Sequence, residues 1–148
     1  MIETPEPSEI TVVREFLEAL QASDTDRALE LLSPAVVYQN VPLPPARGIR
    51  AVEKQLLGLQ RLFTGFEVVH HNIAANGSTV LTERTDVLCL GPVRGAFWVC
   101  GTFEVHDGKI TLWRDRFDFV DFLLSFVRGA VLALVKAVGG RGTPSPSI

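Results

Sequence analysis

Apolar side chains follow two different periods along this chain, and the period changes near residue 65. Before it, apolar residues recur every three or four positions, as on one face of a helix: Ile10, Val13, Phe16, Leu17 and Leu20, and later Ile49, Val52, Leu56, Leu59 and Phe63. After it, apolar and polar positions alternate over residues 66–75, 78–90, 96–105 and 109–117, which is typical of strands. A shorter strand is expected at 36–40. Helices followed by a meander of strands favour an α+β fold, with a curved mixed sheet and helices closing a cone-shaped apolar pocket.

Individual residues suggest where these elements begin and end. Ser8 and Asp24 are residue types that cap helices, so they are expected to start the first helix and a short second one. Pro34 is expected to stop the second helix, because proline cannot donate the next helical hydrogen bond. Asn76-Gly77 predicts a tight hairpin turn between the first two strands of the meander.

The connection after residue 105 decides which residues share a face with Asp115. A two-residue loop would set Asp115 opposite Cys100, whereas a three-residue loop with Gly108 in the left-handed conformation would set it opposite Val99. We favour the longer loop because it gathers several large side chains around one acid. These residues are Phe97, Val99, Trp113, Asp115 and Phe117.

The segment 119–138 is almost entirely apolar, and its charges (Asp121, Arg128 and Lys136) lie near one helical stripe. We favour a helix packed on the protein or buried in a dimer over a helix on a membrane surface. A true membrane span is the least favoured alternative, because charges lie near the middle of the segment. Residues 139–148, rich in Gly, Pro and Ser, are expected to form a disordered tail after a single domain at 1–138.

Bulk composition narrows the function classes. The 148 residues are 47% hydrophobic and 21% charged, with a net charge of −3, so they predict a globular protein and no nucleic-acid partner. No segment is typical of a secretory signal, and Cys89 and Cys100 are expected to be reduced core thiols rather than a disulfide. A cytoplasmic location follows. Because no zinc-type spacing, phosphate loop or serine-nucleophile motif is present, any catalysis must use carboxylates, arginine, tyrosine and amides, with no cofactor or metal.

Three charged residues provide candidate chemistry. Arg84 and Asp86 share one face of the strand 78–90, and burial of two such charges is costly unless they are paired. Asp115 lies between large aromatic side chains on its own strand. We expect Arg84 to bridge the two acids, with repulsion raising the pKa of one carboxyl while the guanidinium keeps the other ionised. The alternatives are a structural Arg84–Asp86 ion pair and a surface Asp115 that pairs with a neighbouring arginine.

Two further residues extend this candidate site. Tyr38 and Asn40 are two apart on a predicted strand and share a face, so they could hold a water molecule for attack. The alternatives are a core tyrosine and a strand-end asparagine. The apolar wall of the pocket is expected to come from residues that could equally be plain core: Leu17, Leu20, Leu59, Phe63, Leu88, Phe97, Val99, Trp113 and Phe117.

Three segments together resemble the limonene-1,2-epoxide hydrolases: residues 37–45 (VYQNVPLPP), 82–88 (TERTDVL) and 108–118 (GKITLWRDRFD). The resemblance implies a dimeric cone related to the nuclear-transport-factor-2-like and ketosteroid-isomerase-like folds. It also implies one-step hydration of a small hydrophobic epoxide, with detoxification or lipid and terpene metabolism as the setting. By matching position, Asp115 would activate water held by Tyr38 and Asn40, Asp86 would protonate the epoxide oxygen, and Arg84 would link the aspartates.

Two other functions fit the same pattern. An isomerase or polyketide cyclase of the related cone fold would need one base and an oxyanion hole, so Arg84 would be dispensable. A non-catalytic lipid or sterol carrier would bind apolar ligands without turnover and use the segment 119–138 for docking or membrane-surface contact.

Overall fold

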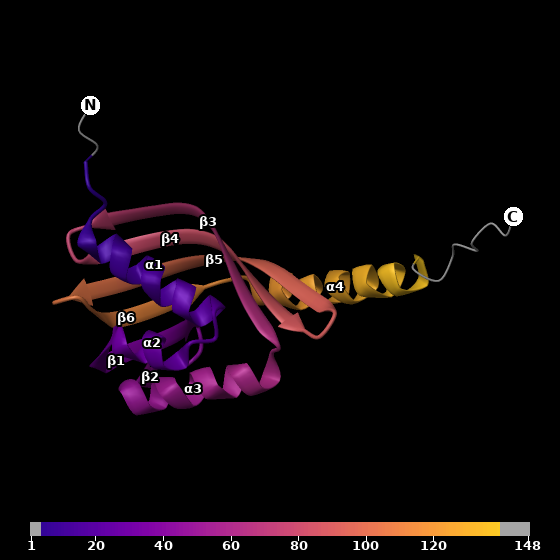
Figure 1. The fold of residues 1–148 in the computed structure, drawn as a ribbon, viewed down its shortest axis with the longest axis horizontal. Helices are drawn as coiled ribbons and strands as arrows, with labels where there is room; N and C mark the ends of the chain where they lie inside the picture. The colour runs from indigo at the N-terminus through magenta and orange to yellow at the C-terminus, as the bar shows by residue number, and fades with distance from the viewer. Residues whose placement is uncertain (1–3, 140–148) are drawn as a thin grey trace, which may run out of the picture.

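The computed structural model describes residues 4–139 (Figure 1). The elements follow in this order: α1 (Ser8–Gln21), α2 (Thr25–Glu30), β1 (Leu32–Val41), β2 (Ala46–Arg47), α3 (Ile49–Leu62), β3 (Gly65–Asn76), β4 (Thr79–Leu90), β5 (Val93–His106), β6 (Lys109–Arg116) and α4 (Phe119–Gly139). The predicted tail at 139–148 lies outside the described residues, except for Gly139 at the end of α4.

The strands form one six-stranded sheet in the order β2-β1-β6-β5-β4-β3. The sheet is mixed, because β1 runs parallel to β6 while the other neighbours are antiparallel. Helices α1, α2 and α3 lie together on one side of the curved sheet, and α4 extends away from it (Figure 1). The predicted α+β fold with a curved mixed sheet is confirmed, and its core is the apolar layer between α1, α3 and the strands.

Several predicted element boundaries are wrong. Ser8 is the first residue of α1 and not its cap, since Pro7 holds the cap position and Ser8 bonds to the neighbouring Glu9 side chain. Asp24 does cap α2, where its carboxylate accepts a hydrogen bond from the Arg27 amide. However, α2 ends at Glu30, and Pro34 lies within β1. The β1–β6 ladder is irregular between Leu32 and Val37, which is where a sheet can accept a residue that has no amide donor.

The β5–β6 loop has the length of the less favoured alternative, but the strand that follows has a register that differs from both. The loop has two residues, Asp107 and Gly108, both with positive φ, but an irregularity after Glu104 then shifts the register by one residue. Asp115 therefore lies opposite Gly101, not opposite Val99 or Cys100. The predicted grouping of Phe97, Val99, Trp113 and Asp115 on one face still holds, because the irregularity supplies the one-residue shift that the longer loop was expected to give.

Helix α4 is not packed along its length within this chain. Only Ser125 and Gly129 are buried, although α4 is long and apolar enough to cross a membrane by length and composition. The two cysteines are free, as predicted, but Cys100 is exposed and only Cys89 is half-buried. Cys100 is therefore not a core thiol.

Candidate active site

A cavity of about 610 Å³ opens between the inner face of the sheet and helices α1, α3 and α4. Eight of the nine predicted wall residues line it: Leu20, Leu59, Phe63, Leu88, Phe97, Val99, Trp113 and Phe117. Leu17 does not, because it is buried in the core and not at the cavity surface. The prediction missed these lining residues: Ser23, Leu56, Gln60, Arg61, Thr64, Gly65, Phe66 and Phe122. Most of them come from the ends of helices and from the α3–β3 connection. The periodicity of the strands does not indicate where these segments lie over the sheet.

Arg84 lies beneath the cavity and bridges two carboxyl groups that line it, those of Asp86 and Asp115. Its Nε donates to Asp86 Oδ1 at 2.8 Å and its Nη2 to Asp86 Oδ2 at 3.1 Å, which is a bidentate contact. Nη2 also forms an ion pair with Asp115 Oδ2 at 2.8 Å. Arg84 is fully buried, and both aspartates are 5% exposed. The structure thus places the three charges as the sequence predicted, and within residues 4–139 neither Arg114 nor Arg116 forms an ion pair with Asp115.

Strand order explains why an arginine is needed here. Asp86 is on β4 and Asp115 is on β6, so β5 lies between them. Two strand spacings amount to roughly 10 Å, too far for direct sharing of a proton. The Arg84 side chain crosses β5 at Gly101, where a Cβ atom would overlap Arg84 Nη1 and lie 2.6 Å from Thr82 Oγ1 and 3.0 Å from Asp115 Oδ1. Gly101 thus leaves the space that the guanidinium occupies.

Thr82 completes the hydrogen bonding of the guanidinium. Arg84 Nη1 donates to Thr82 Oγ1 at 3.0 Å, and the hydroxyl is 3.4 Å from the carbonyl oxygen of Gly101, to which it donates. Thr82 is buried and shares the inner face of β4 with Arg84 and Asp86, two and four residues away. The alternation along the strand placed Thr82 on that face, but nothing in the sequence marked it or Gly101 as part of the site.

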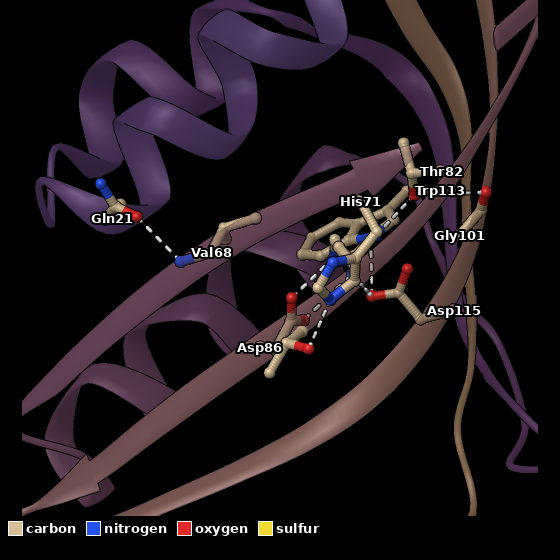
Figure 2. A network of polar contacts seen from close by, with 10 residues as sticks. Gln21, Val68, His71, Thr82, Asp86, Gly101, Trp113 and Asp115 are labelled. Carbon is tan, nitrogen blue, oxygen red and sulfur yellow. Dashed lines mark hydrogen bonds and ion pairs between the residues drawn. The ribbon is translucent and has the colours of Figure 1, made fainter. Parts of the chain in front are cut away.

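Within the described residues, only one of the two carboxyl oxygens of Asp115 has hydrogen-bond partners. Its Oδ2 atom accepts a hydrogen bond from Trp113 Nε1 at 3.0 Å in addition to the Arg84 contact. Figure 2 shows Trp113 and Asp115 side by side, with Asp86 and Thr82 around the same network. Asp115 Oδ1 is buried and has no hydrogen-bond partner among residues 4–139. Asp115 therefore retains the acceptor capacity that a general base needs.

Tyr38 and Asn40 approach the same acid from β1. In the parallel β1–β6 ladder, Asn40 lies beside Asp115 and Tyr38 beside Trp113, with which it stacks at 3.8 Å between ring centroids. Asn40 Nδ2 donates to the Tyr38 hydroxyl at 2.8 Å. This bond leaves the Asn40 amide oxygen free to accept and the Tyr38 hydroxyl proton free to donate, which are the contacts that hold a water molecule.

Burial and neighbouring charges shift the pKa values of three groups in the site. Burial raises the pKa of Asp86 to about 6, Arg84 opposes this shift, and the charge of Asp115 adds to it. Desolvation is therefore the main cause, whereas the sequence argument had assigned the shift to repulsion between the acids. Burial works against the charged form of Arg84, but Asp115 and Asp86 outweigh it and raise its pKa further. Burial and then Asp115 raise the pKa of Tyr38, so its hydroxyl keeps its proton.

The site thus pairs a carboxyl that can carry a proton near neutral pH with a carboxylate that has a free oxygen, at the base of an apolar cavity. Such a pair can give a proton to one atom of a bound molecule while taking a proton from another. Within residues 4–139, no group of three His, Cys, Asp or Glu side chains is placed to hold a metal ion.

Comparisons with known proteins show the family of this chain. The family model of the limonene-1,2-epoxide hydrolase catalytic domain matches residues 7–128. Epoxide hydrolase EphG of Mycobacterium tuberculosis (strain ATCC 25618 / H37Rv) is 48% identical over 126 residues, covering 85% of this chain and 84% of the relative.

Solved structures extend the comparison to the fold. An M. tuberculosis LEH-like epoxide hydrolase superposes with a TM-score of 0.81 at 47% identity, covering 87% of this chain and 96% of that one. An NTF2-like protein from Burkholderia pseudomallei has a TM-score of 0.73 at 14% identity, covering 82% and 98%. A SnoaL-like polyketide cyclase from Jannaschia sp. CCS1 has a TM-score of 0.71 at 16% identity, covering 84% and 97%. The last two likenesses show the fold alone.

Proposed function

The chain belongs to the limonene-1,2-epoxide hydrolase family and is an epoxide hydrolase of that type, and we propose that it adds water to a hydrophobic epoxide in one step, without a cofactor, to give a vicinal diol. The observation that carries this proposal is the buried Arg84 bridge between two aspartates of different character. A chemistry that gives and takes a proton at once requires such a pair, and a single base would not need the bridge.

Each residue then has one role. Asp115 takes a proton from a water held by Tyr38 and Asn40, and the water oxygen forms a bond to one epoxide carbon. The carbon–oxygen bond of the ring breaks as Asp86 donates its proton to the leaving oxygen, so a neutral diol results. A proton has moved from Asp86 to Asp115, and Arg84, bonded to both acids, connects them while the proton is returned.

Physical magnitudes fit a single step. Ring strain makes the epoxide reactive, so no covalent intermediate is needed, and each positioned proton transfer contributes about 10²–10⁴-fold. The apolar wall, with Phe97, Phe117 and Leu88 among its residues, keeps bulk water from the charges and strengthens their interactions. The cavity volume of about 610 Å³ is in the range of small-molecule sites. A cytoplasmic location and a role in detoxification or in lipid and terpene metabolism remain predictions.

The reaction can be tested with ¹⁸O-labelled water in a single turnover, across terpene, fatty-acid and sterol epoxides. We expect one labelled oxygen in the diol from the first turnover, because water attacks directly. Label that appears only after repeated turnovers would instead indicate attack by a carboxylate, and turnover of no epoxide would contradict the proposed reaction.

Substitutions test the roles of the two acids. Asp115→Asn and Asp86→Asn should each abolish diol formation while the far-ultraviolet circular dichroism stays native. The matched control is Glu83→Gln on the same strand, because Glu83 points away from the cavity and bonds to Asn72. Retained turnover in either aspartate variant would contradict its role. Retained turnover in Arg84→Ala would indicate a lone base, as an isomerase or cyclase would use.

A further inference from the structure

Helix α4 carries a wide face of exposed apolar side chains. Its large side chains are each between 50% and 66% exposed, and we refer to them as the α4 apolar face: Val120, Leu123, Leu124, Val127, Val131, Leu134, Val135 and Val138. At about 100° per residue, these positions cover an arc of about 120° along the whole length of the helix. Monomeric soluble proteins seldom leave so continuous an apolar surface uncovered, so the face indicates a binding surface.

The described part of the protein does not cover this face. The side of α4 that contacts β5 holds Ser125 and Gly129, both buried, and Gly129 lies about 180° around the helix from the middle of the apolar face. A Cβ atom at Gly129 would overlap the backbone carbonyl of Arg94, so the first half of α4 lies very close to the sheet. Figure 1 shows the second half of α4 clear of the sheet. The helix is therefore fixed on the protein by one side, and its apolar face is open to a partner.

The charge of this region is opposite in sign to that of the rest of the chain. Residues 122–148 contain 3 basic and no acidic residues, whereas residues 1–121 contain 11 basic and 17 acidic ones. On α4, Arg128 and Lys136 are exposed and lie outside the apolar face, and Arg128 forms an ion pair with Asp121 at 3.2 Å. A basic segment on an otherwise acidic protein is attracted to an anionic lipid surface, while the rest of the chain is repelled from it.

We propose that α4 binds the surface of a bilayer that contains anionic lipids, lying in the plane of the headgroups with its apolar face turned toward the acyl chains. Helices bound in this way bury their apolar face about 5–10 Å deep and keep their polar side in water. Charged residues usually fill that polar side, but here the protein's own sheet covers much of it. A membrane span does not fit, because α4 could cross a bilayer only by leaving the sheet at Gly129 and by burying Arg128 and Lys136.

The width of the apolar face favours lipid over a single partner helix. A helix that pairs with one other helix needs only a narrow apolar seam. Leu123 and Val135 lie about 60° to either side of the middle of the face, so they would stay exposed beside such a seam, whereas acyl chains cover the whole arc. A second copy of the chain would also bring the same basic residues to the contact, whereas anionic headgroups neutralise them.

Binding of α4 to lipid would also bring the cavity to the bilayer. Phe122 of α4 lines the cavity, and Phe126 packs against Phe63, another lining residue, at 6.0 Å between ring centroids. The helix that lies on the bilayer thus forms part of the cavity wall, and hydrophobic epoxides concentrate in lipid. This consequence alone rests on the proposed function, because the apolar face and the basic charge are independent of the reaction.

Two neighbouring residues of α4 provide a charge-matched test. Val131→Glu and Leu132→Glu each lower the net charge by one, but Leu132, which is 62% exposed, lies on the polar side between Arg128 and Lys136 and not on the apolar face. The full chain and both variants would be floated with vesicles of phosphatidylcholine and phosphatidylglycerol in equal parts, over a range of lipid concentrations, with circular dichroism as the check on folding. We expect the wild type to float, and Val131→Glu to bind at least about tenfold more weakly than Leu132→Glu, because a carboxylate among acyl chains is costly.

The contribution of charge is tested with Lys136→Gln. Loss of this positive charge should weaken binding to the anionic vesicles about fivefold and leave binding to vesicles of phosphatidylcholine alone unchanged.

Three results would overturn the proposal. A folded wild type might not float with the anionic vesicles at any lipid concentration, or Val131→Glu and Leu132→Glu might bind equally well, which would mean that the apolar face does not contact lipid. Self-association of the wild type that Val131→Glu abolishes, measured by sedimentation equilibrium and without any vesicle binding, would assign the face to a second copy instead. None of these measurements uses an epoxide, so failure here leaves the proposed reaction intact.

Discussion

Replacement of Gly101 by alanine should disable the site although no charged residue is substituted. Gly101 lies on β5 directly opposite Asp115, beneath the Arg84 side chain as it crosses from β4 to β6. An alanine Cβ would overlap Arg84 Nη1 and approach Thr82 Oγ1 to 2.6 Å and Asp115 Oδ1 to 3.0 Å. An arginine tip can usually move aside. Here it can move only by breaking one of its own contacts, because Arg84 is fully buried and its nitrogens already bond to three side chains.

The expected magnitude follows from what must move. Forcing one methyl group into a packed site costs about 1–3 kcal/mol. If Arg84 shifts, its 2.8 Å contact with Asp115 is the bond with least geometric support, since a bidentate contact holds the other end to Asp86. Loss of one partner from a buried ion pair costs about 3–5 kcal/mol, so part of the site would relax to avoid it. We expect a loss of about 2–4 kcal/mol in the free energy of unfolding and a fall in kcat of at least about 100-fold.

The assay combines urea denaturation with steady-state diol formation. Gly58→Ala is the matched control: Gly58 lies in α3, and a Cβ atom there meets nothing within 4 Å. That substitution should raise the free energy of unfolding by up to about 1 kcal/mol, because alanine is the better helix former, and should leave kcat unchanged. If Gly101→Ala retained wild-type kcat and stability, Arg84 would be free to move, and the argument that the cavity floor is rigid would be wrong.

Three smaller perturbations test the rest of the network. Thr82→Val removes a hydrogen bond to the buried guanidinium and should lower kcat about tenfold in steady-state assays. Thr82→Ser keeps the hydroxyl, so its kcat should stay within about twofold of the wild-type value. Equal losses of kcat in the two variants would indicate that Thr82 acts through packing and not through its hydrogen bond. Trp113→Phe keeps an aromatic ring against Tyr38 but removes the donor to Asp115, so kcat should fall about tenfold with KM little changed, and an increase in KM alone would assign Trp113 to substrate binding. Because Asp86 must be protonated to act as the acid and burial raises its pKa to about 6, kcat should be highest below that pH and should fall as the pH rises through it; a kcat that is constant from pH 5 to 8 would rule out this carboxyl as the acid.

Local patterns in the sequence predicted most of the architecture. Helical spacing identified α1 and α3, and alternation identified β3 to β6 and placed Arg84, Asp86 and Asp115 on inward faces. These features depend only on the spacing of apolar side chains along one helix or strand. The sequence of that segment therefore encodes them without reference to the rest of the chain. The relation between the three charges could be predicted because burial of each is acceptable only if the others lie beside it.

Features that depend on contacts between segments were not predicted correctly. The partner of Asp115 depends on an irregularity after Glu104, and no residue type there marks it. Leu17 follows the same helical period as Leu20, but only Leu20 reaches the cavity, because their depths depend on how α1 lies across the sheet. The role of Gly101 could not be found from periodicity either, since it arises from a side chain that crosses over it from another strand.

The charge balance of the buried network explains why the pKa of Asp86 is raised. With both carboxylates ionised, the guanidinium and the two acids together would carry a net charge of −1 in a region that is almost entirely excluded from solvent. Desolvation penalises that state strongly, and one proton brings the network to neutrality. Asp86 is the carboxyl whose pKa is raised, even though it has the bidentate contact with Arg84, because burial outweighs that contact. Below about pH 6 the site therefore keeps a proton on Asp86, which can be donated to a bound epoxide, while Asp115 Oδ1 has no hydrogen-bond partner among residues 4–139 and can accept one.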